Sequence, residues 1–152
     1  RVGNALFGAP PGDDVTAAVD LKPVFRLRAR VTRVERVEPG ESAGFRRGFM
    51  PVQTTRVATI PVGHTDGYPD TAGGRCEVLI GGHLYPVVTG GVASAHTLVD
   101  VGLDSPVKVG DTVTLIGPEA PAILPIEVGT RTEVGFFFLR TRLSALLPRK
   151  LV

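Results

Sequence analysis

The sequence of 152 residues contains one cysteine, one methionine and no tryptophan. With Cys76 alone the chain cannot form an internal disulfide, and its three histidines do not share the spacing of a metal site. No apolar run approaches the roughly 18 residues that a membrane-spanning helix needs. These absences exclude a disulfide-stapled secreted domain, a zinc module and a helical membrane protein. They predict no metal site and no membrane partner.

An excess of charge of one sign is also missing. Seventeen Lys and Arg stand against 15 Asp and Glu, and a net charge of +2 is too small for a strong phosphate-binding field. An arginine series fits either a nucleic-acid groove or the solvated face of an edge strand. The series is Arg26, Arg28, Arg30, Arg33 and Arg36. The low net charge and the lack of interleaved aromatic residues favour the solvated face, so we expect no nucleic-acid partner.

The beginning of the chain has neither a methionine nor the basic start and apolar core of a signal peptide. We therefore expect a cytoplasmic location, which the single cysteine also fits. The opening segment 1–8 reads as part of something longer.

Glycine and proline, by contrast, are abundant, with 19 and 13 residues spaced between short runs rich in β-branched residues. Apolar residues alternate from Phe25 to Val31, which is the period of a strand with one buried face. The alternation slips at Val34 and Val37 and indicates a bulge or bend there. Gly81-Gly82 separates two further runs and predicts a tight hairpin.

These runs together predict the fold class. Further strands are expected at 56–62, 76–80, 84–88, 97–101 and within 107–117, and short helices only at 14–20 and 121–129. Six or more short strands with regular turns favour closure, because a closed sheet has no exposed edges. The sequence therefore predicts an all-β fold, a small closed or nearly closed β-barrel with little helix.

The segment from His64 to Tyr68 places a titratable ring on a glycine-containing loop directly after an expected strand. Loops at strand ends commonly display reactive groups, so His64 is a candidate for proton transfer. An Asx-type turn at Asp66-Gly67 accounts for most of the same loop without any function.

The same loop lies within the most recognisable string of the sequence. Residues 58–69 read A-T-I-P-V-G-H-T-D-G-Y-P, which resembles the alanine racemase signature V-P-V-G-Y-A-D-G-Y/W. Similar strings follow in the family's order, namely E-V-L-I-G-G at 77–82, T-L-V-D-V at 97–101 and V-K-V-G-D-T-V-T-L-I-G at 107–117. Upstream, L-K-P at 21–23 and L-R-A-R-V at 27–31 also resemble the family's pattern. Residues 1–8 resemble the string that closes the family's catalytic barrel. The colinear resemblance to alanine racemases covers nearly the whole chain.

The resemblance implies a pyridoxal-phosphate enzyme with an N-terminal (β/α)8 barrel and a C-terminal domain made mostly of β-structure. Residues 1–20 would be the tail of the cofactor-binding barrel with a linker, and residues 21–152 the C-terminal β-barrel domain. The cofactor would be bound by the barrel half, so this chain alone is not expected to hold pyridoxal phosphate. The expected partners are a second copy in a homodimer or a TIM-barrel half, together with a small amino-acid substrate.

The resemblance also assigns roles to single residues. Arg1 matches the arginine that contacts the pyridine nitrogen, and Gly3 and Asn4 match positions whose backbone amides bind the phosphate. His64 stands at the family's catalytic tyrosine. Ser94 stands at the methionine whose backbone approaches the substrate carboxylate, which makes it the candidate for substrate binding.

Several of these positions depart from the family's pattern. His64 and Ser94 replace other residue types, and Ala145 stands where a phosphate-binding tyrosine is usual. Departures at functional positions within a retained scaffold leave two functions open. One is a contribution to pyridoxal-phosphate-dependent interconversion of L- and D-alanine, or of a related amino acid, at a dimer interface. The alternative is a catalytically degenerate β-barrel module for interaction or dimerisation. In either case we expect no racemase activity from this chain alone.

Overall fold

The computed structural model describes residues 3–10 and 20–151 and contains seven antiparallel strands. The strands are β1 (Leu27–Arg30), β2 (Arg33–Val37), β3 (Thr55–Ile60), β4 (Glu77–Ile80), β5 (His83–Val92), β6 (Thr97–Asp100) and β7 (Thr112–Ile116). The helices are α1 (Pro125–Arg131) and α2 (Phe136–Arg142). Short 3-10 turns are η1 (Asn4–Phe7), η3 (Phe45–Arg47), η4 (His64–Asp66), η5 (Asp70–Ala72) and η6 (Pro121–Ile123). Within the described residues, no helix has the length and apolar character needed to cross a membrane.

The strands follow one another around the molecule in the order β1-β7-β4-β5-β6-β3-β2. The two end strands, β1 and β2, are parts of one extended segment that bends at Val31 and Thr32. The N–H of Val31 donates to the carbonyl of Asp111, at 2.9 Å, on the β7 side. The N–H of Thr32 donates to the carbonyl of Thr59, also at 2.9 Å, on the β3 side. The sheet therefore curls into a nearly closed barrel, which confirms the predicted fold class.

The bend in this first segment comes earlier than the sequence pattern indicates. The slip was expected at Val34 and Val37, whereas the strand breaks between Arg30 and Arg33. The reason is that the segment changes pairing partner there, and neighbouring residues must bond to opposite sides of the barrel. Hydrophobic alternation reports which face is buried and not which strand lies alongside.

Strand β5 is also longer than expected, since it runs from His83 to Val92. Its first part pairs with β4 and its last part with β6, so the strand crosses from one side of the barrel to the other. The register against β6 shifts between Val87 and Val92, and Gly90 within the shift has a φ of +65°. The predicted hairpin between β4 and β5 is confirmed, because Gly81 and Gly82 both have positive φ, as a two-residue turn of this type requires.

The barrel interior is filled by apolar side chains from every part of the sheet. Fully buried examples are Ala58, Ile60, Val78, Val99, Val113 and Leu115. Inward residues alternate with outward ones in β4, where Val78 and Ile80 are buried and their neighbours only half-buried. Alternation of this kind is what lets a single hydrophobic core form inside a small barrel.

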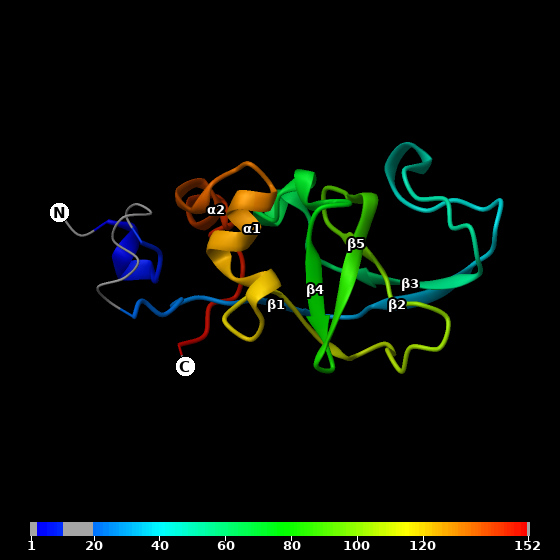
Figure 1. The fold of residues 1–152 in the computed structure, drawn as a ribbon, viewed down its shortest axis with the longest axis horizontal. Coiled ribbons are helices and arrows are strands. Elements are labelled where there is room, and N and C mark those ends of the chain that lie inside the picture. The colour runs from blue at the N-terminus through cyan, green and yellow to red at the C-terminus, as the bar shows by residue number, and fades with distance from the viewer. Residues whose placement is uncertain (1–2, 11–19, 152) are drawn as a thin grey trace.

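The two helices pack together at one end of the barrel, as Figure 1 shows. The predicted short helix at 121–129 is present as η6 and α1, while the one expected at 14–20 lies almost entirely outside the described residues. Helix α2 was not anticipated. Its buried residues Phe136 and Leu139 are three apart, whereas Phe137 and Phe138 are about half exposed, at 49% and 55%. Gly129 permits the close approach of the helices, because a Cβ there would lie 2.9 Å from the backbone of Gly135.

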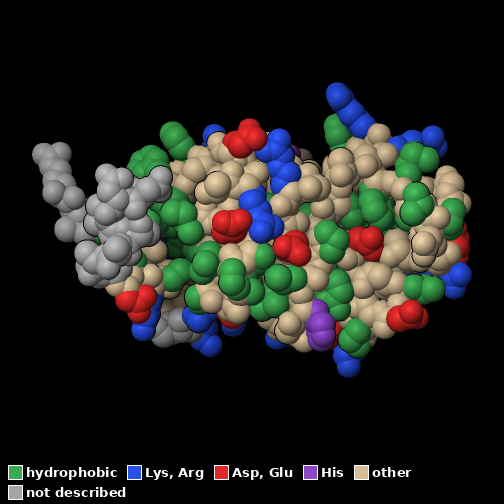
Figure 2. Space-filling model, viewed as in Figure 1, with side chains coloured by type: hydrophobic (Ala, Val, Ile, Leu, Met, Phe, Trp, Pro, Cys, Tyr) green, Lys and Arg blue, Asp and Glu red, His purple; other side chains and the backbone are tan. Residues whose placement is uncertain are grey.

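The arginine series lies on the surface, where four of its members form ion pairs and Arg30 donates to the carbonyl of Gly110 at 2.8 Å. Glu119 accepts hydrogen bonds from Arg26 at 2.8 Å and from Arg28 at 2.5 Å, and Arg33 is paired with Glu35 at 2.7 Å. Figure 2 shows acidic and basic side chains interspersed over one face of the molecule, rather than a field of one sign. The interpretation of the series as a solvated face accounts for this arrangement.

Candidate functional site

The predicted His64 loop is a turn of 3-10 helix, η4, that follows β3 and lies against the turn between β5 and β6. The N–H of His64 donates to the carbonyl of Ala93 at 3.0 Å, and the N–H of Thr65 donates to the carbonyl of Ser94 at 3.1 Å. The hydroxyl of Thr65 donates to the same Ser94 carbonyl at 2.6 Å. Two backbone hydrogen bonds and the Thr65 hydroxyl therefore hold the two turns together.

Gly63 makes this close approach possible. A Cβ at Gly63 would lie 2.3 Å from the carbonyl oxygen of Ala93 and 2.4 Å from that of Ser94. Any other residue would push the turns apart. The glycine of the signature string thus has a packing role that the sequence pattern alone does not reveal.

Asp66 closes the turn in a different way from the expected Asx-type turn. Its carboxylate accepts a hydrogen bond from the N–H of Gly63, three residues earlier, at 2.9 Å. The chain then reverses at Gly67, whose φ is +99°. The carbonyl of Asp66 accepts from the N–H of Ser144 at 3.0 Å, so the segment after α2 supports the other side of the turn. A Cβ at Gly67 would lie 2.4 Å from the carbonyl oxygen of Arg142.

The structure brings together two of the predicted site residues, His64 and Ser94. The Nε2 atom of His64 and the Oγ atom of Ser94 are 3.3 Å apart, within hydrogen-bond distance. Both side chains are exposed. Ala145, the third departure from the family's pattern, directly follows Ser144 and therefore lies next to the same turn.

The structure does not bring the predicted cofactor-binding residues to this turn. Gly3 and Asn4 lie at the start of η1, which is beyond α2 at one end of the molecule (Figure 1). The guanidinium of Arg140 lies over the ring of Phe7, 4.1 Å from its centroid, and attaches η1 to α2. Arg1 lies outside the described residues.

Two other reactive groups near the turn belong to the core. The side chain of Tyr68 is fully buried, and its hydroxyl has no hydrogen-bond partner among the described residues. Burial raises the pKa of Tyr68 well above its ordinary value. Burial likewise raises the pKa of the Cys76 thiol to about 11. Both groups keep their protons near neutral pH, so neither is a candidate base or nucleophile there.

One element at this end of the barrel was missed by the sequence reasoning. The turn η3 packs on the irregular part of β5, where a Cβ at Gly48 would lie 2.6 Å from the carbonyl oxygen of Thr89. Arg46 and Arg47 within the turn both have positive φ, at 54° and 56°. The signal available in the sequence is the pair Gly44 and Gly48 on either side of Phe-Arg-Arg.

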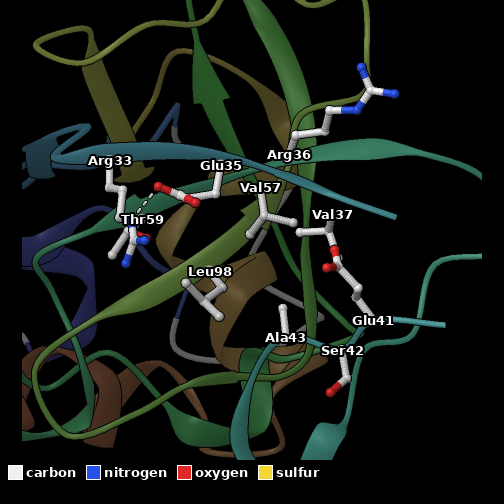
Figure 3. Close-up of a pocket in the computed structure, with 10 residues that line it drawn as sticks. All are labelled: Arg33, Glu35, Arg36, Val37, Glu41, Ser42, Ala43, Val57, Thr59 and Leu98. Carbon is white, nitrogen blue, oxygen red and sulfur yellow. Dashed lines mark hydrogen bonds and ion pairs between the residues drawn. The ribbon is translucent and has the colours of Figure 1, made fainter. Parts of the chain in front are cut away.

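A groove of about 380 Å³ lies elsewhere on the barrel, over β2, β3 and β6 and beneath the segment that follows β2. In Figure 3, Arg33 and Glu35 face one another at one side of it, Val57 and Leu98 lie in the middle, and Arg36 points away. The Arg33 guanidinium is already bonded to Glu35 at 2.7 Å. None of its lining residues belongs to the His64 turn.

The fold and the site define a β-barrel domain that carries its candidate residues on exposed turns. Residues 24–150 match the family model described as the alanine racemase C-terminal domain. The chain therefore belongs to the alanine racemase C-terminal domain family.

Curated relatives agree with this assignment. Alanine racemase of Geobacter sulfurreducens is 42% identical over 117 residues, which cover 77% of this chain and 30% of that protein. Alanine racemase of Halothermothrix orenii is 34% identical over 151 residues, which cover 99% of this chain and 40% of that protein. The chain thus spans between 30% and 40% of the length of these two relatives.

Solved structures share the fold. The biosynthetic alanine racemase from Pseudomonas aeruginosa has a TM-score of 0.86 and 30% identity, with 97% of this chain and 40% of that chain covered. Alanine racemase from Bartonella henselae with covalently bound pyridoxal phosphate has a TM-score of 0.82 and 31% identity, with 93% and 38% covered.

Proposed function

We propose that this chain contributes to pyridoxal-phosphate-dependent interconversion of L- and D-alanine, or of a related small amino acid. In this proposal it works with a (β/α)8 barrel, and residues 1–20 are the tail of that barrel with a linker. One observation carries the proposal. His64, within the family's signature string, is exposed on a turn that backbone hydrogen bonds with Ala93, Ser94 and Ser144 support on two sides. That arrangement presents an acid–base group to a site that the (β/α)8 barrel would complete.

The described residues fit one end of the cofactor and not the other. Gly3 is exposed and a Cβ there would meet nothing within 4 Å, so the backbone at the start of η1 is open to a phosphate group. Arg1, Gly3 and Asn4 are the residues that we propose for this end. The lysines of the sequence are Lys22, Lys108 and Lys150, all exposed, and none follows a cofactor-lysine pattern. The barrel must therefore supply the residue that binds the aldehyde.

Pyridoxal phosphate, when bound, supplies an electron sink that makes the Cα hydrogen of the amino acid acidic. His64 would remove or return that proton on one face of Cα. An imidazole titrates near neutrality, with an ordinary pKa of about 6.5, whereas a phenol titrates near 10. A histidine in place of the family's tyrosine can therefore exchange protons readily at neutral pH. The group on the opposite face would come from the barrel, and a homodimer is one way to bring the two together.

The role of His64 can be tested in a hybrid enzyme, in which this chain replaces the matched segment of the Halothermothrix orenii racemase. Exchange of the Cα hydrogen with deuterated water is followed separately for L- and D-alanine. We expect H64F to slow exchange of one enantiomer by roughly a hundredfold or more, the usual contribution of a general base, and the other enantiomer far less. The matched control is H96F, a change at another exposed histidine nearby. Small and equal effects of H64F on both enantiomers would make His64 a residue of the loop only.

The departures at His64, Ser94 and Ala145 favour one alternative, a module for interaction or dimerisation without racemase chemistry. Ala145 is exposed and provides no hydroxyl. The loss of one hydrogen bond to a charged group costs about 1.5–3 kcal/mol, or roughly tenfold or more in affinity. A hybrid that binds pyridoxal phosphate and forms its dimer, yet exchanges neither enantiomer, would support this module. Exchange by the unmodified hybrid would reject it.

A further inference from the structure

We propose that Ser94 is a positioning residue for His64, because its Oγ accepts a hydrogen bond from Nε2–H of the imidazole and leaves Nδ1 as the nitrogen that exchanges the proton. The inference rests on the proposed function and adds to it, since it assigns a role to the serine side chain and to each ring nitrogen. This role is separate from the backbone role that the family pattern gives to position 94.

The geometry of the pair supports this assignment. Nε2 of His64 and Oγ of Ser94 are 3.3 Å apart although the residues are 30 positions apart in sequence. Their backbones are joined through Thr65, whose N–H and hydroxyl both donate to the Ser94 carbonyl, at 3.1 and 2.6 Å. The N–H of His64 itself donates to the Ala93 carbonyl at 3.0 Å. These hydrogen bonds fix the backbones of His64 and Ser94 relative to each other, so the backbone loses little conformational entropy when the two side chains bond.

The surroundings keep the two turns at this separation. At Gly63 the backbones approach so closely that a Cβ would lie 2.4 Å from the Ser94 carbonyl. On the other side, the N–H of Ser144 donates to Asp66 at 3.0 Å. The turn is therefore held on both sides, and the imidazole is oriented by the single side-chain partner that it has among the described residues, Ser94.

The chemistry of imidazole then decides which nitrogen reacts. A neutral ring has one N–H and one nitrogen with a free lone pair. If Ser94 donated to Nε2, that lone pair would be occupied and the ring could not act as a base through it. If Ser94 accepts from Nε2–H, the Nδ1 lone pair is free. The Cα–H bond of the substrate then breaks, its proton bonds to Nδ1, and its electron pair stays with the substrate.

A hydroxyl suits this cycle better than an ionised partner. The protonated ring still donates from Nε2–H to Oγ, so the contact persists while Nδ1 gains and loses its proton. A carboxylate in the place of Ser94 would favour the charged ring and hinder return of the proton. The neutral serine hydroxyl favours the charged ring less than a carboxylate would, so the imidazole can both take up the proton and return it.

The first test uses the chain itself, labelled with ¹⁵N, and measures the ratio of the Nε2–H to the Nδ1–H tautomer of neutral His64 by NMR. H64Q identifies the signals of His64 among the three histidines. We expect S94A to lower the ratio roughly two- to tenfold, which corresponds to one net hydrogen bond. S94T, which keeps a hydroxyl, should restore it. The matched control S42A, at an exposed serine in the groove of Figure 3, should leave it unchanged. A ratio that is unchanged or higher in S94A overturns the proposal.

The second test uses the hybrid enzyme and separates this proposal from the proposed function. S94A should lower kcat for the same enantiomer that H64F affects, by roughly two- to tenfold, with little change in KM, and S94T should recover most of the loss. If KM rises and kcat is unchanged, Ser94 binds substrate and does not position His64, and the proposal is overturned. If H64F shows no preference between enantiomers, the proposed function of His64 fails, whatever the tautomer measurement shows.

Discussion

At the scale of single residues, neighbouring side chains of the His64 turn differ sharply in their exposure to solvent. His64 is exposed, whereas Tyr68, four positions later, is fully buried, with a hydroxyl that has no hydrogen-bond partner in the described part of the chain. Both carry a polar ring and both lie in the signature string, so the string alone does not tell which ring is exposed. The difference arises because the chain reverses at Gly67 and sends Tyr68 into the core.

The buried hydroxyl of Tyr68 leads to a prediction about stability. A buried polar group without a partner is costly, so removing it is neutral or favourable. We expect Y68F to raise the free energy of unfolding by up to about 1 kcal/mol. The matched change is Y85F, which loses a 3.0 Å hydrogen bond to Ser105 and should lower that free energy by about 1 kcal/mol. Urea denaturation followed by circular dichroism measures both, and a greater loss in Y68F than in Y85F would contradict the argument.

The site residues were predictable from the sequence to different degrees. His64 is a candidate because of its place in a recognisable string, and its side chain is exposed in the structure. Its contact with Ser94 was not predictable, because it depends on two turns that are brought together only by the closed barrel. The backward hydrogen bond of Asp66 was also missed, since the same dipeptide permits either turn.

At the scale of elements, Glu119 connects the segment after β7 to the residues at β1 and just before it. Burial alone would raise the pKa of Glu119, but hydrogen bonds from Arg28 and Arg26 outweigh it and hold the pKa below its ordinary value of 4.5. A carboxyl with a lowered pKa stabilises the folded state above its ordinary pKa. That stabilisation is lost as the pH falls through the folded-state value.

We therefore expect E119Q to be less stable than the unmodified chain by about 1 kcal/mol at pH 7. The difference should shrink as the pH is lowered below about 4.5, where Glu119 of the unmodified chain takes up its proton. Thermal unfolding at a series of pH values measures it. E133Q is the control, because Glu133 pairs with Arg75 in an exposed position and should have little effect. A difference that grows toward acid pH would refute the assignment.

Elements were predictable where a local pattern decides them. The hairpin at Gly81-Gly82 follows from turn chemistry alone and is confirmed. Helix α2 was missed because its run of three phenylalanines is as typical of a strand as of a helix. The helix forms because Phe136 and Leu139 bury the same face against α1 and the barrel, a contact that the local sequence does not specify.

At the scale of the whole molecule, the barrel depends on the bend at Val31 and Thr32. We expect T32P to lower the free energy of unfolding by about 3 kcal/mol, because proline cannot donate to the Thr59 carbonyl that closes the ring. T32A also loses the hydroxyl contact to Thr59 but keeps the N–H, and should cost less than about 1 kcal/mol. Denaturation compares the two, and equal effects would show that this hydrogen bond does not support closure.

The barrel itself was predictable because glycine and proline mark the ends of many short strands. The place of closure was not, because the closing segment continues from β1 to β2 without any turn residue between them. Strand order and closure are properties of pairing between distant segments, and neither composition nor periodicity encodes them.

The burial of Cys76 has a practical consequence for chemical labelling. Its side chain is 2% exposed, and its thiol has a pKa of about 11, so a maleimide reagent at neutral pH finds neither access nor thiolate. The folded chain is therefore unreactive toward such reagents. A cysteine introduced at an exposed position of the neighbouring turn, such as A95C, would therefore react alone, and a fluorophore there would report directly on anything that approaches the His64 turn.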